Sequence, residues 1–312
     1  MEYCLKCLEP LNEKSKLQWH LSCSKKFFNR NTPPLISLDK ETFEELAIEA
    51  SRGKSTITGV QRKLPLNFTN DEPFSLVNYP TRYILKAQSL EYEQLPQLEA
   101  IVMYLADKAN INCVENGLMK IEDGSLVYIT KRIDRVFEDD YVEKIHMEDF
   151  CQLTERLTED KYKSSYEQCA KVVKKYSSQI PLDLAALFYL ILFSFVTGNS
   201  DMHLKNFSLY TPMQNLTVLA PAYDLLPVSL IIDDSEQMAL TLLGKRSKIK
   251  GSDFLKLAEN FSLDSKIAPR LIKRVINLEE TFNEYIKRSF ISSDYKTSLS
   301  ALISERLKDL KD

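Results

Sequence analysis

Hydrophobic and polar positions follow two different periods along the chain, and the period changes near its middle. Apolar and polar residues alternate at positions 64–68, 83–86 and 126–133, between Asn-Asp, Tyr-Pro and Asp-Gly turn signals. We expect these segments to be strands of a mixed or antiparallel sheet. Apolar residues recur at helical spacing in 38–51 and 95–109. The first half is therefore predicted to be α+β.

Beyond about residue 147 the helical period dominates the pattern. Helices are predicted at 148–154, 162–176, 182–196 and most of 251–310. Two short β-prone segments, 207–210 and 216–220, interrupt this half and predict a small hairpin that carries polar residues. The second half is therefore predicted to be mainly helical.

Chain length and the position of two prolines together predict the domain organisation. A chain of 312 residues is at the size where single cores give way to two lobes. Two prolines at 33 and 34 mark a first boundary. We expect a cysteine-rich N-terminal segment at 1–30, a mixed α/β N-lobe at 31–146 and a helical C-lobe at 147–312.

Composition and charge exclude several classes of protein. The chain is 44% hydrophobic and 27% charged, with a formal net charge of -3, which is typical of a folded globular protein and not of a disordered one. It lacks the basic excess that binding to a nucleic-acid backbone requires. The apolar run 184–196 is shorter than the roughly 20 residues of a membrane span, and the N-terminus lacks a secretion signal. The simplest expectation is a cytoplasmic protein without membrane contact; export into another cell stays open.

Polar groups follow that apolar run at a spacing that suits phosphoryl transfer. Asp201 and Asn206 lie five residues apart, and Asp224 follows the second β-prone segment. In phosphoryl transfer one aspartate accepts the proton of the attacking hydroxyl, while an asparagine and a second aspartate hold magnesium. The alternative is a helix-terminal turn in which these side chains cap backbone groups. His203 is more often an orienting histidine than a proton shuttle.

At this point the sequence resembles a known family. The strings GNSDMHLKNFSL (198–209) and LAPAYDLLPV (219–228) resemble the catalytic segment of the HipA family of bacterial toxin kinases. Other HipA-like segments occur in the same order, namely TITGVQRKL, TRYILK, LPQLEAIVMYLA, ITKRIDR and HMEDFCQL. The resemblance covers roughly residues 50 to 230 and implies a two-lobed, protein-kinase-like fold.

The resemblance implies a serine/threonine protein kinase that uses ATP and Mg²⁺. It makes Asp201 the catalytic base, Asn206 and Asp224 the magnesium ligands, and Lys86 the lysine on the ATP phosphates. Further positions implied around the nucleotide are Gly59, Val60, Gln61, Lys131, Ile133, His203 and Lys205. Lys131 and Ile133 would contribute backbone to adenine.

Two further features of the N-lobe concern regulation and the position of the lysine. In some relatives, hydroxyl residues of the phosphate loop are autophosphorylated and the loop is ejected; the corresponding positions here are Thr56 and Thr58. Glu99 falls where the family has a helix glutamate. Leu98 stands in place of the asparagine that usually precedes it, which weakens a role for Glu99.

The short N-terminal region resembles the HipT type within the family. That type implies a small HipS-like protein and a HipB-like antitoxin as partners, with DNA bound only indirectly through the antitoxin. Family targets are aminoacyl-tRNA synthetases, modified on serine to arrest growth. Two other interpretations remain: an inactive kinase-fold binding module and a small-molecule phosphotransferase.

The cysteine-rich segment has the spacing of a metal site. Cys4-x-x-Cys7 and His20-x-x-Cys23 are separated by twelve residues, which matches the ligand number and approximate spacing of a Cys₃His zinc site. A bound Zn²⁺ would supply folding energy to a segment too short for a core of its own. The alternative is that these thiols are small apolar contacts.

Overall fold

The computed structural model describes residues 2–11, 17–36, 63–68, 81–89, 91–137, 142–232 and 236–312. The chain divides into two compact units. Unit 1 comprises Met1–Tyr104, Val114–Lys144 and Arg288–Ile291; unit 2 comprises Leu105–Cys113, Ile145–Lys287 and Ser292–Asp312. The helix expected at 38–51 lies outside the described residues.

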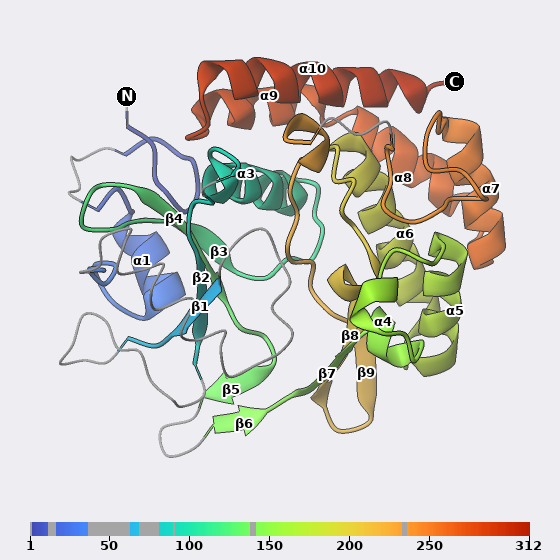
Figure 1. Ribbon diagram of the computed structural model, residues 1–312, viewed down its shortest axis with the longest axis horizontal. Coiled ribbons are helices and arrows are strands. Elements are labelled where there is room, and N and C mark those ends of the chain that lie inside the picture. The colour runs from blue at the N-terminus through green and yellow to red at the C-terminus, as the bar shows by residue number, and fades with distance from the viewer. Residues whose placement is uncertain are drawn as a thin grey trace. The chain divides into compact units, whose positions relative to one another are not determined.

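Unit 1 is built on a four-stranded antiparallel sheet with the strand order β1-β2-β4-β3 (Figure 1). Its elements are α1 (Leu21–Phe28), β1 (Lys63–Leu66), β2 (Tyr83–Lys86), α3 (Leu95–Lys108, whose last turn belongs to unit 2), β3 (Asn116–Lys120), β4 (Leu126–Lys131), β5 (Arg135–Phe137) and β6 (Val142–Lys144). The predictions of strands at 83–86, 64–68 and 126–133 and of a helix at 95–109 are confirmed, with small shifts at the ends. Strand β3 was not predicted, because three consecutive buried residues replace the alternation that marks a strand.

Helix α1 was also not predicted, and aromatic packing fixes it on the sheet. The rings of Phe27 and Phe28 each lie 5.7 Å from the ring of Tyr83 in β2. Trp19, just before the helix, packs against both phenylalanines. A helix of eight residues is marginal by itself, so this packing supplies most of its stability.

Unit 2 is mainly helical, as predicted, and it surrounds one apolar helix. Its elements are β7 (His146–Asp149), α4 (Phe150–Leu153), α5 (Tyr166–Tyr176), α6 (Ile180–Val196), β8 (Ser208–Met213), β9 (Leu216–Leu219), α7 (Gly251–Phe261), α8 (Ile267–Ile276), α9 (Glu279–Arg288, whose last residue belongs to unit 1) and α10 (Ser293–Asp309), with 3₁₀ turns at Thr158–Asp160, Leu204–Asn206 and Val228–Leu230. Helix α6 contacts α5, α7, α8 and α10. Because neighbours cover it on several sides, it is apolar around most of its circumference.

The hairpin predicted in the second half is confirmed, and a third strand joins it. Strands β8 and β9 pair antiparallel, and β7 adds to the other side of β8. The helix predicted at 148–154 is therefore too long at its start, because residues 148 and 149 belong to β7. Helix α4 begins after Asp149, whose carboxylate accepts the Gln152 N–H while the Gln152 side chain accepts the Asp149 N–H.

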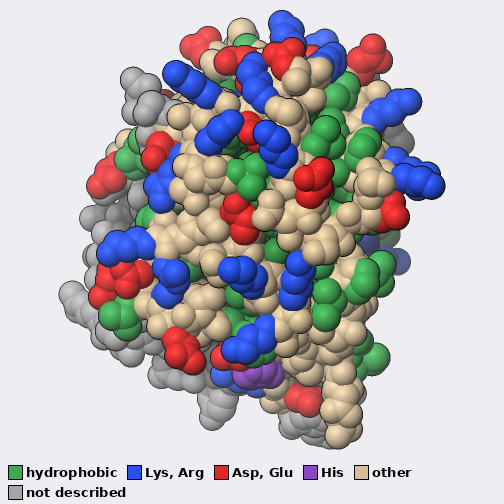
Figure 2. Space-filling view, turned by 90° about the vertical axis from the view of Figure 1, so that its right-hand side faces the viewer, with side chains coloured by type: hydrophobic (Ala, Val, Ile, Leu, Met, Phe, Trp, Pro, Cys, Tyr) green, Lys and Arg blue, Asp and Glu red, His purple; other side chains and the backbone are tan. Residues whose placement is uncertain are grey.

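The distribution of charged side chains on the surface agrees with the nearly balanced charge of the sequence. On the face shown in Figure 2, Lys and Arg side chains are interspersed with acidic and hydrophobic ones, and neither charge forms a continuous field. Within the described part of the chain, no helix combines the length and the apolar character that crossing a membrane requires.

Candidate active site

The polar loop 197–203 starts directly at the end of the buried helix α6. Thr197 closes the helix, because its hydroxyl donates to the Phe193 carbonyl at 3.0 Å. Gly198 follows with a φ of 70°, in the left-handed region, where a Cβ atom would lie 2.5 Å from Leu302 Cδ2. This turn therefore favours glycine. The buried helix is a rigid support that turns the chain sharply into the loop.

Asp201 is half-exposed in this loop and is held from two sides. Its backbone N–H donates to Asn199 Oδ1 at 3.3 Å, and Asn199 itself is buried. Its carboxylate Oδ1 accepts a hydrogen bond from the Tyr162 hydroxyl. Burial, and then this bond to Asp201, raise the pKa of Tyr162 above its usual 10, so the phenol stays a donor at neutral pH.

Asn206 is joined to Asp201 through the backbone. Asn206 Nδ2 donates to the Asp201 carbonyl at 2.9 Å, and the same carbonyl accepts the His203 N–H at 2.8 Å. These bonds fold the loop into a compact turn that continues as the 3₁₀ turn Leu204–Asn206. The predicted base, Asp201, and one predicted magnesium ligand, Asn206, therefore lie in the same hydrogen-bonded turn.

Asp224 reaches the same region from the segment after β9. The preceding residue, Tyr223, bonds to Ser208 Oγ at 2.6 Å and donates to the Lys205 carbonyl at 3.1 Å. Asp224 has a φ of 60°. A left-handed conformation is uncommon outside glycine, although Asp tolerates it better than most, and such positions cluster at functional sites. Sequence reasoning did not single out Tyr223 or Tyr162, because a tyrosine carries no spacing signal.

His203 is buried beside Asp201. Burial lowers the pKa of its ring below the usual 6.5, and the carboxylates of Asp201 and Asp224 oppose that shift. His203 Nε2 is 4.0 Å from Asp201 Oδ1, and the ring packs edge-on against Tyr162 at 5.0 Å. A neutral, packed imidazole suits an orienting role.

Lys205 makes an ion pair within unit 2. Its Nζ lies 2.9 Å from Asp149 Oδ2, the carboxylate that also caps α4. The contact fixes the lysine side chain to the start of α4. A role of Lys205 near phosphate stays a prediction.

In unit 1, Lys86 at the end of β2 forms a buried ion pair with Glu99 of α3. The Nζ to Oε1 distance is 2.6 Å, and 5% and 0% of the two side chains are exposed. Tyr128 of β4 lies beside the lysine, with its ring centre 5.4 Å from Nζ. We expected Leu98 to weaken a role for Glu99. Leu98 is a buried core residue of the same helix, and Glu99 still pairs with Lys86.

The remaining predicted nucleotide contacts are placed only in part. The Lys131 N–H donates to the Glu115 carbonyl, and its Nζ lies 2.7 Å from Glu115 Oε2. Ile133 is half-buried in the bend after β4. The residues predicted in the phosphate loop all lie outside the described residues: Thr56, Thr58, Gly59, Val60 and Gln61.

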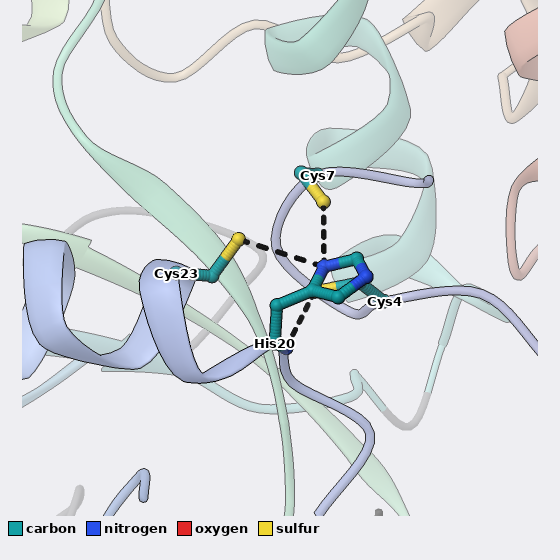
Figure 3. A group of neighbouring side chains, drawn as sticks. All are labelled: Cys4, Cys7, His20 and Cys23. Atoms are coloured by element: carbon teal, nitrogen blue, oxygen red, sulfur yellow. Dashed lines mark hydrogen bonds between the residues drawn. The ribbon is translucent and has the colours of Figure 1, made fainter. Parts of the chain in front are cut away.

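The predicted cysteine and histidine cluster is assembled in unit 1. The ligand atoms of Cys4, Cys7, His20 and Cys23 all lie within 4.8 Å of one another. Figure 3 shows the His20 ring between Cys7 and Cys23, at the start of α1. Cys4, Cys7 and Cys23 form no disulfide bond.

The two units define an α+β protein with a mixed N-terminal part and a helical C-terminal part. Residues 55–282 match the HipA-like C-terminal domain family. The chain belongs to this family.

Two curated relatives illustrate the extent of the similarity. A Haemophilus influenzae protein named "Putative kinase" is 28% identical over 324 residues, covering 93% of this chain and 92% of that protein. "Putative kinase Y4mE" of Sinorhizobium fredii is 30% identical over 243 residues, covering 75% of this chain and 56% of that protein.

Solved structures share the fold. HipA of Shewanella oneidensis, determined in a complex of its toxin-antitoxin system with HipB and operator DNA, aligns with a TM-score of 0.69 at 18% identity, covering 97% of this chain and 73% of HipA. The Helicobacter pylori proinflammatory kinase CtkA aligns with a TM-score of 0.53 at 14% identity, covering 76% of this chain and 90% of CtkA. The predicted two-lobed, kinase-like α+β fold is confirmed.

Proposed function

We propose that this protein is an ATP-dependent serine/threonine protein kinase and acts as the toxin of a HipA-type toxin-antitoxin system. The observation that carries the proposal is the buried Lys86–Glu99 ion pair. Protein kinases use a strand lysine, held by a helix glutamate, to bind the ATP phosphates. Taking two charges out of water is costly. A buried pair of this kind, in a member of a family that includes kinases, supports a phosphate-binding function.

The second group of side chains supports the transfer step. We assign Asp201 as the group that orients the substrate hydroxyl and accepts its proton. Asn206 and Asp224 offer the oxygen ligands that Mg²⁺ prefers. Bound Mg²⁺ would neutralise charge on the phosphates. Tyr162, Asn199 and Tyr223 are positioning residues, because they fix the backbone or the carboxylates through hydrogen bonds.

Regulation and partners are proposed by analogy with the family. The S. oneidensis relative was solved with HipB and DNA, and we propose a HipB-like antitoxin, together with a small HipS-like protein, as partners here. The proposed target is a serine of an aminoacyl-tRNA synthetase. Thr56 and Thr58 are the proposed autophosphorylation positions. We also propose that 31–146 and 147–312 act as the N-lobe and C-lobe of the kinase.

Transfer of γ-phosphate from labelled ATP by the purified full chain, with Mg²⁺ and a bacterial lysate, tests the proposal. We expect label on protein with the wild type, and a loss of about 10²- to 10⁴-fold with Asp201→Asn, the range for removal of a general base. Asp160→Asn is the matched control, because Asp160 is a partly exposed carboxylate that pairs with Lys163 and has no assigned role in transfer.

Three outcomes would contradict the proposal. Label on small molecules alone would indicate a small-molecule phosphotransferase. ATP binding without transfer, seen as thermal stabilisation by the nucleotide, would indicate an inactive binding module. Equal transfer by Asp201→Asn and wild type would refute the assignment of Asp201.

A further inference from the structure

The four side chains of the cysteine and histidine cluster are arranged as the corners of one coordination site. His20 Nδ1 lies 3.3 Å from Cys7 Sγ and 3.9 Å from Cys23 Sγ. Around a tetrahedral Zn²⁺, with Zn–S of about 2.3 Å and Zn–N of about 2.0 Å, sulfur and nitrogen ligands are separated by about 3.5 Å. The observed separations bracket that value. We propose that Cys4, Cys7, His20 and Cys23 form a structural zinc site.

The hydrogen bond at the far side of the His20 ring prepares Nδ1 for a metal. Nε2 lies 3.0 Å from the Pro10 carbonyl oxygen, so Nε2 must carry the proton and donate. The lone pair is then on Nδ1, which faces the thiols (Figure 3). Histidine ligands of metals are typically oriented by such a bond from their other nitrogen to a carbonyl.

A backbone N–H group points at one of the sulfur atoms. The His20 N–H is 3.4 Å from Cys4 Sγ. Such a donor stabilises a thiolate, which is the form that binds metal. Thiols that served only as apolar contacts would need neither this donor nor an imidazole between them.

The ligand set selects the metal and the type of site. Three thiolates and one imidazole favour Zn²⁺ over Mg²⁺ or Ca²⁺, which prefer oxygen. Four protein ligands complete a tetrahedron and leave no position for a substrate, so the site is structural rather than catalytic.

The position of the site indicates what a bound Zn²⁺ would stabilise. The Cys4–Cys7 turn and the start of α1 are pinned to the edge strand β3: the Leu118 N–H donates to the Leu5 carbonyl at 3.1 Å, and Trp19 Nε1 donates to the Leu118 carbonyl at 3.0 Å. The Leu5 N–H donates to the Gln18 carbonyl at 2.8 Å. Zinc would therefore cross-link two segments that cover one edge of the sheet that carries Lys86.

Metal analysis of the full chain, purified with a reductant, tests the site. We expect about one Zn²⁺ per chain in the wild type, and loss of the metal with a lower unfolding temperature in Cys7→Ser and His20→Ala. Cys151→Ser is the matched control, because a serine hydroxyl can replace the Cys151 thiol as donor to the Arg156 and Leu157 carbonyls. His20→Cys should keep the metal, since four thiolates also bind Zn²⁺.

Cobalt provides a test that does not depend on the variants folding. Wild-type protein loaded with Co²⁺ should show the intense visible bands of a tetrahedral site and the ultraviolet charge-transfer bands of Co–thiolate bonds. Added Zn²⁺ should remove both, and chelation should expose three further thiols to a thiol reagent. The proposal is overturned if the wild type binds neither metal under reducing conditions, or if Cys151→Ser loses as much zinc as Cys7→Ser. These readouts are independent of kinase activity.

Discussion

Lys86 Nζ and Glu99 Oε1 lie 2.6 Å apart, and both side chains are almost fully buried. The pair joins the end of β2 to α3, two elements that are nine residues apart in sequence. A lysine and a glutamate at i and i+13 carry no helical or strand periodicity, so no local pattern predicts that they meet. The contact arises because the sheet and the helix pack together.

Replacing Glu99 by Gln should destabilise the protein strongly. The substitution keeps the shape of the side chain but removes the buried countercharge of the Lys86 ammonium. Breaking one partner of a buried pair typically costs about 3–5 kcal/mol of the free energy of unfolding. Chemical denaturation measures that cost, and nucleotide affinity should fall in parallel if Lys86 binds phosphate.

Glu115→Gln is the matched control for this prediction. Glu115 also pairs with a lysine of the same sheet, Lys131, at 2.7 Å, but 27% and 33% of the Lys131 and Glu115 side chains are exposed. Exposed pairs contribute about 0–1 kcal/mol. Similar losses for Glu99→Gln and Glu115→Gln would show that burial does not strengthen the first pair.

His203 should make stability depend on pH in the acid range. Burial lowers the pKa of its ring below 6.5 in the folded protein. Below pH 6.5 the unfolded chain therefore binds a proton that the folded chain resists, and stability falls as the pH drops. Above pH 6.5 this contribution is fully present. His203→Gln should flatten the curve of unfolding free energy against pH between 6.5 and the lowered folded pKa.

The effect on that curve can be assigned to His203 with one control. His146 has a largely exposed ring that pairs with Glu148 at 2.9 Å. Because an exposed pair contributes little to stability, His146→Gln should not reproduce the flattening seen with His203→Gln. An equal flattening in both variants would mean that the slope does not come from the buried ring; an unchanged slope in His203→Gln would contradict the prediction.

Local patterns predicted most of the fold and failed at identifiable places. The alternation at 83–86 predicted β2, and the long apolar run predicted α6. Strand β3 was missed because its residues Leu118 and Met119 are both buried, which breaks the alternation. Helix α1 was missed because its stability comes from contacts of Phe27 and Phe28 with residues that are distant in sequence.

Some residues of the candidate site were also predictable from local patterns, and others were not. Asp201 and Asn206 were found because their spacing is a local signal, and Cys4, Cys7, His20 and Cys23 because two short motifs carry the ligands. The Tyr162 hydroxyl on Asp201 and the Tyr223 bond to Lys205 are tertiary contacts. Sequence separations of 39 and 18 residues leave no periodic trace of them.

Asn206→Asp should disrupt the loop more than its small chemical change suggests. Asn206 Nδ2 donates to the Asp201 carbonyl at 2.9 Å, and an aspartate would place a carboxylate oxygen against that carbonyl. The repulsion should displace Asp201 and lower phosphate transfer by about 10²-fold, as misplacement of a catalytic group does. Asn260→Asp changes the same type of bond, to the Lys256 carbonyl at an exposed position of α7, and should leave transfer unchanged. Equal transfer by both variants would contradict this role of Asn206.

Gly198→Ala tests whether the turn after α6 positions the catalytic loop. Alanine at a φ of 70° costs about 1 kcal/mol. Its Cβ would also lie 2.5 Å from Leu302 Cδ2, so the end of the Leu302 side chain must move aside, which adds about 0.5–1.5 kcal/mol if it leaves its preferred rotamer.

Gly244→Ala isolates the steric part of this effect. Gly244 lies in the same unit at a φ of 80°. Among the described residues other than its two chain neighbours, no atom lies within 4 Å of the place that an added methyl group would take, so its substitution carries the backbone cost alone. Denaturation of both variants should show the larger loss for Gly198→Ala, and Leu302→Ala should recover the steric part of that loss because it removes the clashing methyl group. If the two glycine variants lose the same stability, the contact with α10 does not constrain the loop. If Gly198→Ala loses more stability and transfer falls with it, the support that α6 and α10 give to Asp201 is part of the catalytic arrangement.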